Sequence, residues 1–273
     1  MPDRRITSRQ NERVKQAVRL HHARDRAEQG RYTIDGVREI SRALAGGAEF
    51  LEAFVCEELL ADDLARALSA RLEAADVPLW QVDRDIFAKV AFGARHEGIV
   101  AIARMREQPL SALKLPADPL VAVLVGIEKP GNVGAVLRSA DGAGVSAVIV
   151  ANGGTDLFNP NTIRTSLGTL FTVPIAAATG AETLAWLRAQ GLTIYGARPD
   201  AELLYHQADF MRPTAIVLGS EATGLTADWL APDVQAIRLP MHGAADSLNV
   251  SATAAVLFYE ARRMRDTRLP KRT

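Results

Sequence analysis

Three short segments of the chain combine glycine with polar side chains that can bind or orient a ligand. They span 131–138, 219–225 and 243–251, and each follows an aliphatic run typical of a buried strand. Glycine lets backbone N–H and C=O groups approach a ligand closely. Open α/β sheets build ligand sites at the carboxyl ends of their strands. Any one of these loops could be a plain tight turn, but the three together indicate one ligand site.

Other familiar ligand and cofactor patterns are missing from the sequence. The segment 131–134 opens a predicted helix, yet the complete G-x-G-x-x-G of dinucleotide-binding folds is absent. Neither a P-loop nor a G-x-S-x-G nucleophile elbow occurs. The five histidines are scattered and Cys56 is the single cysteine, so we expect no metal site and no disulfide within the chain.

Composition and charge are those of a globular protein with basic ends. The 273 residues carry no formal net charge and 48% of them are hydrophobic. Arginine and lysine concentrate in 4–42 and in 262–272, and such segments can neutralise nucleic-acid phosphates or form solvated helix faces. No run approaches the roughly 20 apolar residues that cross a bilayer, and the start of the chain is charged. We therefore expect a cytoplasmic protein without membrane contact.

Alternating strand and helix patterns predict an α/β fold with two domains. We place an N-terminal domain at 1–107, a proline-punctuated linker at 108–118 and a second domain at 119–273. In the first domain, a helix is expected from the cap at Ser8 to about Arg26, followed by strands at 32–36, 50–56, 79–82 and 98–103 and helices at 37–44, 59–74 and 85–90. In the second, continuous aliphatic runs predict a parallel sheet buried between helices, with strands at 120–127, 147–150, 192–195, 215–218 and 236–239 and helices at 133–144, 181–190 and 249–265.

The order and spacing of the three segments carry a family resemblance. They read NVGAVLRSA from Asn132, LGSEATGL from Leu218, and LPM from Leu239 followed by SLNVS from Ser247. This pattern resembles the three signature motifs of the SpoU/TrmH family, RNA ribose 2′-O-methyltransferases with a knotted SPOUT fold. The strings YTIDGVRE (32–39) and HEGIVA (96–101) resemble the family's frequent N-terminal RNA substrate-binding domain. Asp35 and Glu97 stand there where the family usually has Glu and Gln.

The resemblance implies a cofactor, a partner and a set of site residues. The cofactor would be S-adenosylmethionine, bound in a cleft made by a trefoil knot. RNA would be the substrate, with ribosomal RNA favoured over transfer RNA, and the enzyme would be an obligate homodimer with sites at its interface. The positions that match the family's usual backbone contacts to the cofactor are Gly219, Leu239 and Leu248, and we expect Leu218, Ser220 and Met241 beside them to bind it too. Those that match its catalytic residues are Asn132, Arg138, Glu221, Ser247 and Asn249.

The role of Arg138 can be refined on chemical grounds. The family mechanism often gives this arginine the part of general base, but a guanidinium has a pKa above about 12 and stays protonated in proteins. We therefore expect Arg138 to hold the phosphate beside the target ribose and to stabilise developing alkoxide charge. Ser247, Asn249 and Glu221 would orient it. The structural alternatives are a helix-surface salt bridge for Arg138 and a helix cap for Asn249.

Two other classes of function are compatible with parts of the sequence. A noncatalytic RNA-binding or ribosome-assembly protein of the same fold would be expected to show damaged motifs, and all three are intact here. A nucleotide-dependent oxidoreductase would bind a nicotinamide cofactor instead. The motifs do not specify the target nucleotide, and they do not distinguish a housekeeping role from one in antibiotic resistance.

Overall fold

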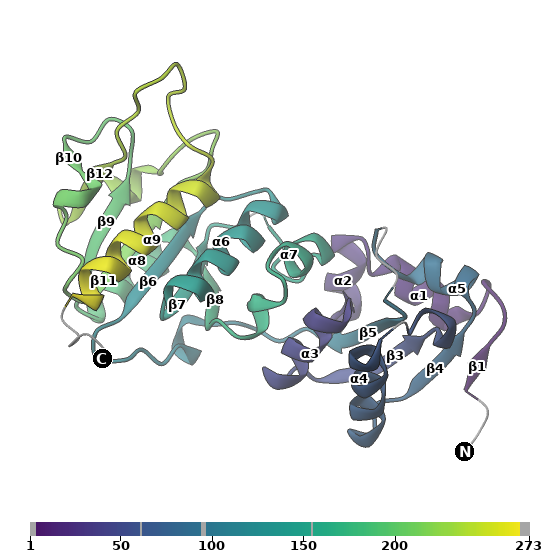
Figure 1. The fold of residues 1–273 in the computed structure, drawn as a ribbon. Helices are drawn as coiled ribbons and strands as arrows, with labels where there is room; N and C mark the ends of the chain where they lie inside the picture. The colour runs from purple at the N-terminus through teal and green to yellow at the C-terminus, as the bar shows by residue number, and fades with distance from the viewer. Residues whose placement is uncertain (1–3, 61, 94–96, 154, 268–273) are drawn as a thin grey trace. The chain divides into compact units, whose positions relative to one another are not determined.

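The computed structural model describes residues 4–60, 62–93, 97–153 and 155–267. Contacts within the chain divide it into two compact units (Figure 1). Both contain helices and a sheet, in agreement with the predicted α/β class. Unit 1 comprises Met1–Glu107 with Asp156–Thr172, and unit 2 comprises Gln108–Thr155 with Val173–Thr273. His96 and the C-terminal basic residues Arg268, Lys271 and Arg272, which the sequence analysis singled out, lie outside the described residues.

A mixed five-stranded sheet with the order β1-β4-β3-β5-β2 organises unit 1. The β4 strand pairs in parallel with β1 and β3, whereas β5 is antiparallel to β3 and β2. The strands are β1 Arg5–Ile6, β2 Arg31–Asp35, β3 Phe50–Val55, β4 Leu79–Val82 and β5 Ile99–Arg104. The helices are α1 Glu12–Arg19, α2 Ala23–Gln29, α3 Val37–Ala45, α4 Asp63–Ala74, α5 Arg84–Val90 and α7 Pro160–Thr165, with short 3-10 turns η1 Glu57–Leu59 and η3 Thr169–Phe171.

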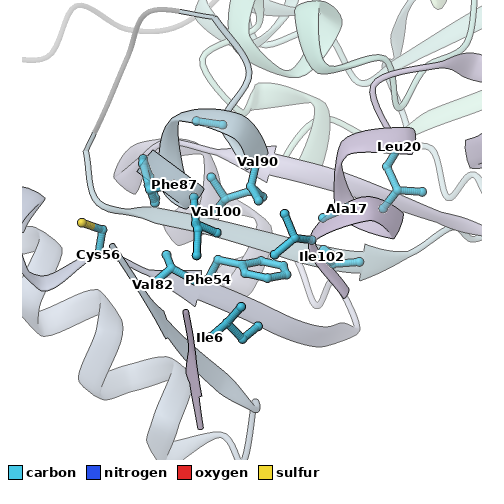
Figure 2. Packing of buried hydrophobic residues seen from close by; sticks show 13 residues of the cluster. Ile6, Ala17, Leu20, Phe54, Cys56, Val82, Phe87, Val90, Val100 and Ile102 are labelled. Carbon is cyan, nitrogen blue, oxygen red and sulfur yellow. The ribbon is translucent and has the colours of Figure 1, made fainter. Parts of the chain in front are cut away.

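The core on one face of this sheet is built from strand residues and two helices (Figure 2). Phe54 of β3 and Ile102 of β5 pack with Ala17 of α1 and with Phe87 and Val90 of α5. All five side chains are almost completely buried. Removing these apolar surfaces from water provides the main driving force for folding unit 1.

The predicted single helix from Ser8 to about Arg26 is wrong, because the chain forms two helices there. The side chain of Asn11, not Ser8, caps α1 by accepting a hydrogen bond from the Arg13 backbone N–H at 2.9 Å. The helix then ends at Arg19 with Leu20 as its C-cap, and the Leu20 carbonyl accepts a hydrogen bond from the Arg26 side chain at 2.7 Å. That carbonyl is therefore occupied by a guanidinium instead of continuing the helical ladder.

The segment Asp156–Thr172 completes the interior of unit 1. The fully buried Arg26 side chain donates from Nε to Asp156 Oδ2 at 2.6 Å. Tyr32 of β2 stacks on Phe158, with ring centroids 4.3 Å apart. A stretch of sequence that follows β7 of unit 2 thus supplies an ion partner and an aromatic ring to unit 1.

Unit 2 contains a seven-stranded, entirely parallel sheet with the order β10-β12-β9-β11-β6-β7-β8. Its strands are β6 Leu120–Val125, β7 Ala147–Ala151, β8 Ile175–Ala178, β9 Thr193–Ala197, β10 Leu203–Leu204, β11 Thr214–Leu218 and β12 Val234–Arg238. Its helices are α6 Pro130–Ala143, α8 Gly180–Ala189 and α9 Val250–Asp266, with 3-10 turns η2 Leu110–Ala112, η4 Tyr205–Gln207 and η5 Ala227–Leu230. The predicted parallel sheet flanked by helices is confirmed.

Helices cover both faces of this sheet. On one face, α8, η5 and apolar side chains of 110–115 pack on alternate residues of the central strands. On the other, α6 and α9 lie side by side and pack against each other (Figure 1). Every residue of β6, β7 and β11 is buried, which accounts for their continuous aliphatic sequences. Across the described residues, none of the helices is long and apolar enough to cross a membrane.

The Asp35 carboxyl lies in an unfavourable place for a charge. Burial raises its pKa to about 7, and the nearby Glu97 and Glu39 act in the same direction. The Phe92 backbone N–H, which donates to Asp35 Oδ2 at 2.8 Å, and the Arg164 cation act in the opposite direction but are outweighed. Asp35 Oδ1 is buried with no hydrogen-bond partner among the described residues. The Asp35 carboxyl therefore keeps its proton to a higher pH in the folded protein than in the unfolded chain.

The first prediction concerns the buried ion pair. Asp156→Asn keeps the shape of the side chain but leaves the Arg26 cation buried without a countercharge, so unit 1 should lose about 3 kcal/mol of stability. Urea unfolding followed by a probe in unit 1 measures this. The matched control is Asp233→Asn, which weakens the exposed pair with Arg188 and should leave the midpoint unchanged. An unchanged midpoint for Asp156→Asn would contradict the structural role of the pair.

The second prediction concerns pH. The folded pKa of Asp35 lies above the unfolded value of 3.8, so folding takes up a proton and stability falls as pH rises from about 4 to about 7. Asp35→Asn removes this titration. The stability of the variant relative to the parent chain should therefore increase across that window and level off above about pH 7. Parallel denaturation curves at several pH values test this, and a constant difference would show that Asp35 ionises normally.

Candidate functional site

The three glycine-containing segments meet at one edge of the unit 2 sheet. They follow the carboxyl ends of β6, β11 and β12, and because the sheet is parallel, those ends share an edge. The first segment continues into α6 and the third into α9, and these two helices pack together. The sheet therefore brings together residues that lie more than a hundred positions apart in the sequence.

Glu221 connects residues of all three segments through one carboxylate. Its Oε1 accepts hydrogen bonds from Asn132 Nδ2 at 2.9 Å and from Asn249 Nδ2 at 2.7 Å. The two amides also meet, with Asn249 Nδ2 donating to Asn132 Oδ1 at 3.4 Å. Three of the five predicted catalytic residues thus form a single hydrogen-bonded cluster, which we call the Glu221 cluster.

Asn249 is at once a helix cap and a member of this cluster. Its Oδ1 accepts from the Ser251 backbone N–H at 2.9 Å and so caps α9, while its Nδ2 reaches Glu221. The helix-cap interpretation and the functional one therefore hold for different atoms of the same side chain. Capping fixes the amide plane, which aims the Nδ2 group at the carboxylate.

Lys129, which none of the three motifs includes, gives the cluster its cation. Lys129 Nζ donates to Glu221 Oε2 at 2.6 Å. This hydrogen bond, followed by those from Asn132 and the Val250 backbone, holds the pKa of Glu221 below its ordinary value. The same contact raises the pKa of Lys129. The signal in the sequence is a lysine three residues before the motif asparagine, at the entrance to α6.

A cavity of about 220 Å³ lies beside the cluster. Each of the six positions predicted to bind a cofactor is on its wall, together with Glu221 and Ser247. Leu239, Met241 and Leu248 supply apolar surface, and Leu248 is 41% exposed. Arg198, Arg238 and Asp246 add charge of both signs. This wall suits a ligand with an aromatic ring and a zwitterionic end.

The loop that contains Gly219 is closed on itself. Ser220 and Gly224 exchange two backbone hydrogen bonds, at 3.0 and 3.2 Å, and Ser220 Oγ accepts from the Thr223 backbone N–H at 3.1 Å. A Cβ atom at position 219 would lie 2.3 Å from the backbone carbon of Gly224. Glycine is thus required at 219 for the loop itself, whatever ligand the cavity takes.

Among the described residues, Ser247 and Arg138, the other two predicted catalytic residues, are not hydrogen-bonded to the Glu221 cluster. Ser247 is exposed on the cavity wall. Arg138 is exposed on α6, is not among the cavity-lining residues, and has no ion pair or hydrogen bond within the described part of the chain. A helix-surface salt bridge therefore does not account for Arg138 in this structure, and its guanidinium is available to a ligand.

Most of the basic residues near the N-terminus are engaged with acids of unit 1. Arg9 pairs with Asp85, Arg19 with Asp25, and Arg13 with Glu52, while Arg13 also lies 4.3 Å from the centre of the Trp80 ring. Among the described residues of this segment, the exposed arginines without an ion pair are Arg4, Arg5, Arg24 and Arg38. Those four are better placed than the paired ones to contact phosphates.

Comparison with known proteins agrees with this geometry. Residues 119–259 match the SpoU rRNA Methylase family, and residues 11–101 match the MRM3-like substrate binding domain. A relative from Vibrio vulnificus (strain CMCP6), 23S rRNA (guanosine-2'-O-)-methyltransferase RlmB, is 35% identical over 222 residues, covering 79% of this chain and 90% of its own.

Two solved structures extend the likeness to nearly the whole chain. One, described as an RNA 2'-O ribose methyltransferase, is 44% identical with a TM-score of 0.83, covering 96% of this chain and 99% of its own. The other is the AdoMet-bound rRNA methyltransferase from Sinorhizobium meliloti, which is 25% identical with a TM-score of 0.86, covering 95% of this chain and 97% of its own.

The fold and these matches define an RNA 2′-O-methyltransferase with an added substrate-binding domain. The chain belongs to the SpoU rRNA methylase family.

The closed loop at Gly219 gives a prediction about S-adenosylmethionine, the cofactor implied by the resemblance. Gly219→Ala places a Cβ against the Gly224 backbone, so the loop must shift and affinity should fall at least about tenfold. Calorimetry with S-adenosylmethionine measures it. Gly243→Ala is the matched control, since a Cβ there has no atom within 4 Å, and its affinity should match that of the parent chain. Equal affinities in both variants would place the ligand away from this loop.

Proposed function

We propose that this protein transfers the methyl group of S-adenosylmethionine to the 2′-hydroxyl of a ribose in ribosomal RNA, with transfer RNA as the alternative substrate. The observation that carries the proposal is the Glu221 cluster, in which residues of all three motifs are hydrogen-bonded beside one cavity. The 23S rRNA specificity in the name of the Vibrio relative supports ribosomal RNA. A protein that methylates ribosomal or transfer RNA would act in the cytoplasm, which is the location that we propose for this one.

The cavity wall has the chemistry that S-adenosylmethionine needs. Leu239, Met241 and Leu248 can enclose the adenine ring, and backbone groups around Gly219 can satisfy its polar edge. Glu221 and Asp246 provide negative charge toward a sulfonium or an ammonium group, and the basic residues of the wall can meet a carboxylate. When bound, the cofactor supplies an activated methyl group. The trefoil knot implied by the resemblance remains a prediction.

The remaining residues would prepare the ribose hydroxyl for methyl transfer. A hydroxyl is a weak nucleophile, so it must be held in line and its developing charge stabilised. We assign that charge stabilisation to Arg138, whose guanidinium can also grip the adjacent phosphate. The Glu221 cluster holds the edge of the site in place, and Ser247 on the cavity wall can orient the reacting groups.

A homodimer accounts for the exposed features of α6 and α9. Val256 and Tyr259 of α9 are 36% and 53% exposed, although they are apolar or aromatic, and α9 packs beside the helix that carries Arg138. A second copy could cover these side chains. Arg138, which does not line the cavity of its own chain, would then be free to act at the interface. Residues 1–107 would select the RNA as the substrate domain, with 108–118 as the linker and 119–273 as the catalytic domain. Of the catalytic domain, Asp156–Thr172 packs into unit 1.

Arg138→Lys tests the proposed mechanism. Lysine supplies a point charge in place of a planar fork of donors, so turnover should fall at least about a hundredfold while S-adenosylmethionine affinity and most RNA affinity are kept. The assay follows transfer of labelled methyl groups to ribosomal RNA and to transfer RNA, and maps the 2′-O-methylated nucleotide. Transfer to ribosomal RNA alone is the expected result.

Two outcomes would overturn parts of the proposal. A preserved maximal rate with a shifted pH optimum in Arg138→Lys would show simple general-base action, since the lysine would do the same job at a lower pH. Methylation of transfer RNA alone by the parent enzyme would replace the substrate proposed here.

A further inference from the structure

Lys129 occupies a fixed position at the entrance to α6. It is the residue before Pro130, the first residue of that helix, and its backbone is extended, with φ −82° and ψ 115°. A residue that precedes proline is restricted to such extended conformations. The backbone of Lys129 therefore fixes the direction of its Cα–Cβ bond. Its Nζ atom meets Glu221 Oε2 at 2.6 Å.

The two oxygens of Glu221 have different partners. Oε1 accepts from the Asn132 and Asn249 amides, and Oε2 accepts from Lys129. Within the described residues, Lys129 is the one cation that pairs with this carboxylate. Its hydrogen bond lowers the pKa of Glu221 most, ahead of those from Asn132 and the Val250 backbone. Without the cation, the carboxylate is free to rotate away from the amides. Asn132 then loses its partner on Oε1, and Asn249 is held only by its cap on α9.

Stability alone does not explain this contact. The Lys129 side chain is 73% exposed, and ion pairs at that exposure contribute little to folding. Its effect is instead geometric: a carboxylate held at both oxygens has one orientation, and the two amides on Oε1 then have one orientation as well.

We propose that Lys129 is a positioning residue for methyl transfer, which fixes the ionised Glu221 carboxylate so that Asn132 and Asn249 are held at the reactive edge of the cavity. This inference rests on the proposed function of the Glu221 cluster. It assigns to Lys129 an effect on the rate of the chemical step and no direct contact with the reacting atoms.

The test uses Lys129→Met, which keeps the aliphatic stem and removes the charge. Single-turnover methylation of the RNA substrate at saturating S-adenosylmethionine should slow about tenfold, with RNA affinity unchanged within about twofold. The acid limb of the pH-rate profile should move to higher pH, because Glu221 loses the partner that lowers its pKa most. Lys129→Arg should restore most of the rate and return the acid limb of the pH-rate profile to its original position.

Arg188→Met is the matched control, since it removes another exposed ion pair of unit 2, with Asp233, and should leave rate and pH profile unchanged. A parent-like rate and acid limb in Lys129→Met would overturn the proposal. So would an unchanged rate combined with weaker RNA binding and a flatter salt dependence, because that result assigns Lys129 to a phosphate.

Glu221→Gln separates this inference from the function on which it rests. If Glu221→Gln is slow and Lys129→Met is not, the cluster acts in catalysis without Lys129 and only the inference on Lys129 fails. If Glu221→Gln keeps the full rate and pH profile, the proposed site itself is wrong.

Discussion

One carboxylate, that of Glu221, holds together loops that follow three different strands. An ionised carboxylate has room for several donors, and here it takes two side-chain amides and an ammonium group. Hydrogen bonds to a charged acceptor are stronger than those between neutral groups, which suits a site built from exposed loops. The shape of the cavity edge depends on this junction, because the first turns of α6 and α9 both contact it.

The parallel sheet makes that junction feasible. Strands β6 and β11 are buried on both faces, so the first two of the three loops start from rigid positions. The helices that follow the first and third loops, α6 and α9, pack against each other, which fixes the far end of both connections. Flexible glycine-rich loops thus become a defined surface through restraints at both ends.

Much of this arrangement could be predicted from the sequence, and the exceptions have physical causes. Continuous aliphatic runs identified the central strands, and the spacing of the motifs identified the loops. The single helix expected near the N-terminus failed because the Arg26 guanidinium takes the carbonyl of Leu20. The burial of Arg26 depends on Asp156, 130 positions away, and no local pattern reports such a partner.

In the site, too, local sequence patterns predict some contacts, while others depend on residues far apart in the sequence. Asn249 carries the local signature of a helix cap, and its second bond to Glu221 is visible only once the sheet is formed. Lys129 has no motif of its own in the sequence, since its importance comes from the position of a carboxylate 92 residues later. Conversely, the N-terminal arginines look like a phosphate-binding segment, yet several of them have acidic partners in unit 1.

A double-mutant cycle on the methylation rate tests most directly whether the three motifs act as one unit through Glu221. The rate is measured for Asn132→Ala and Asn249→Ala, each in the parent chain and in Glu221→Ala. We predict strong coupling: once Glu221 is removed, either asparagine change should slow the reaction by no more than about twofold further. If the losses multiply as for independent sites, each asparagine acts on its own, and Glu221 is not the residue that holds the site together.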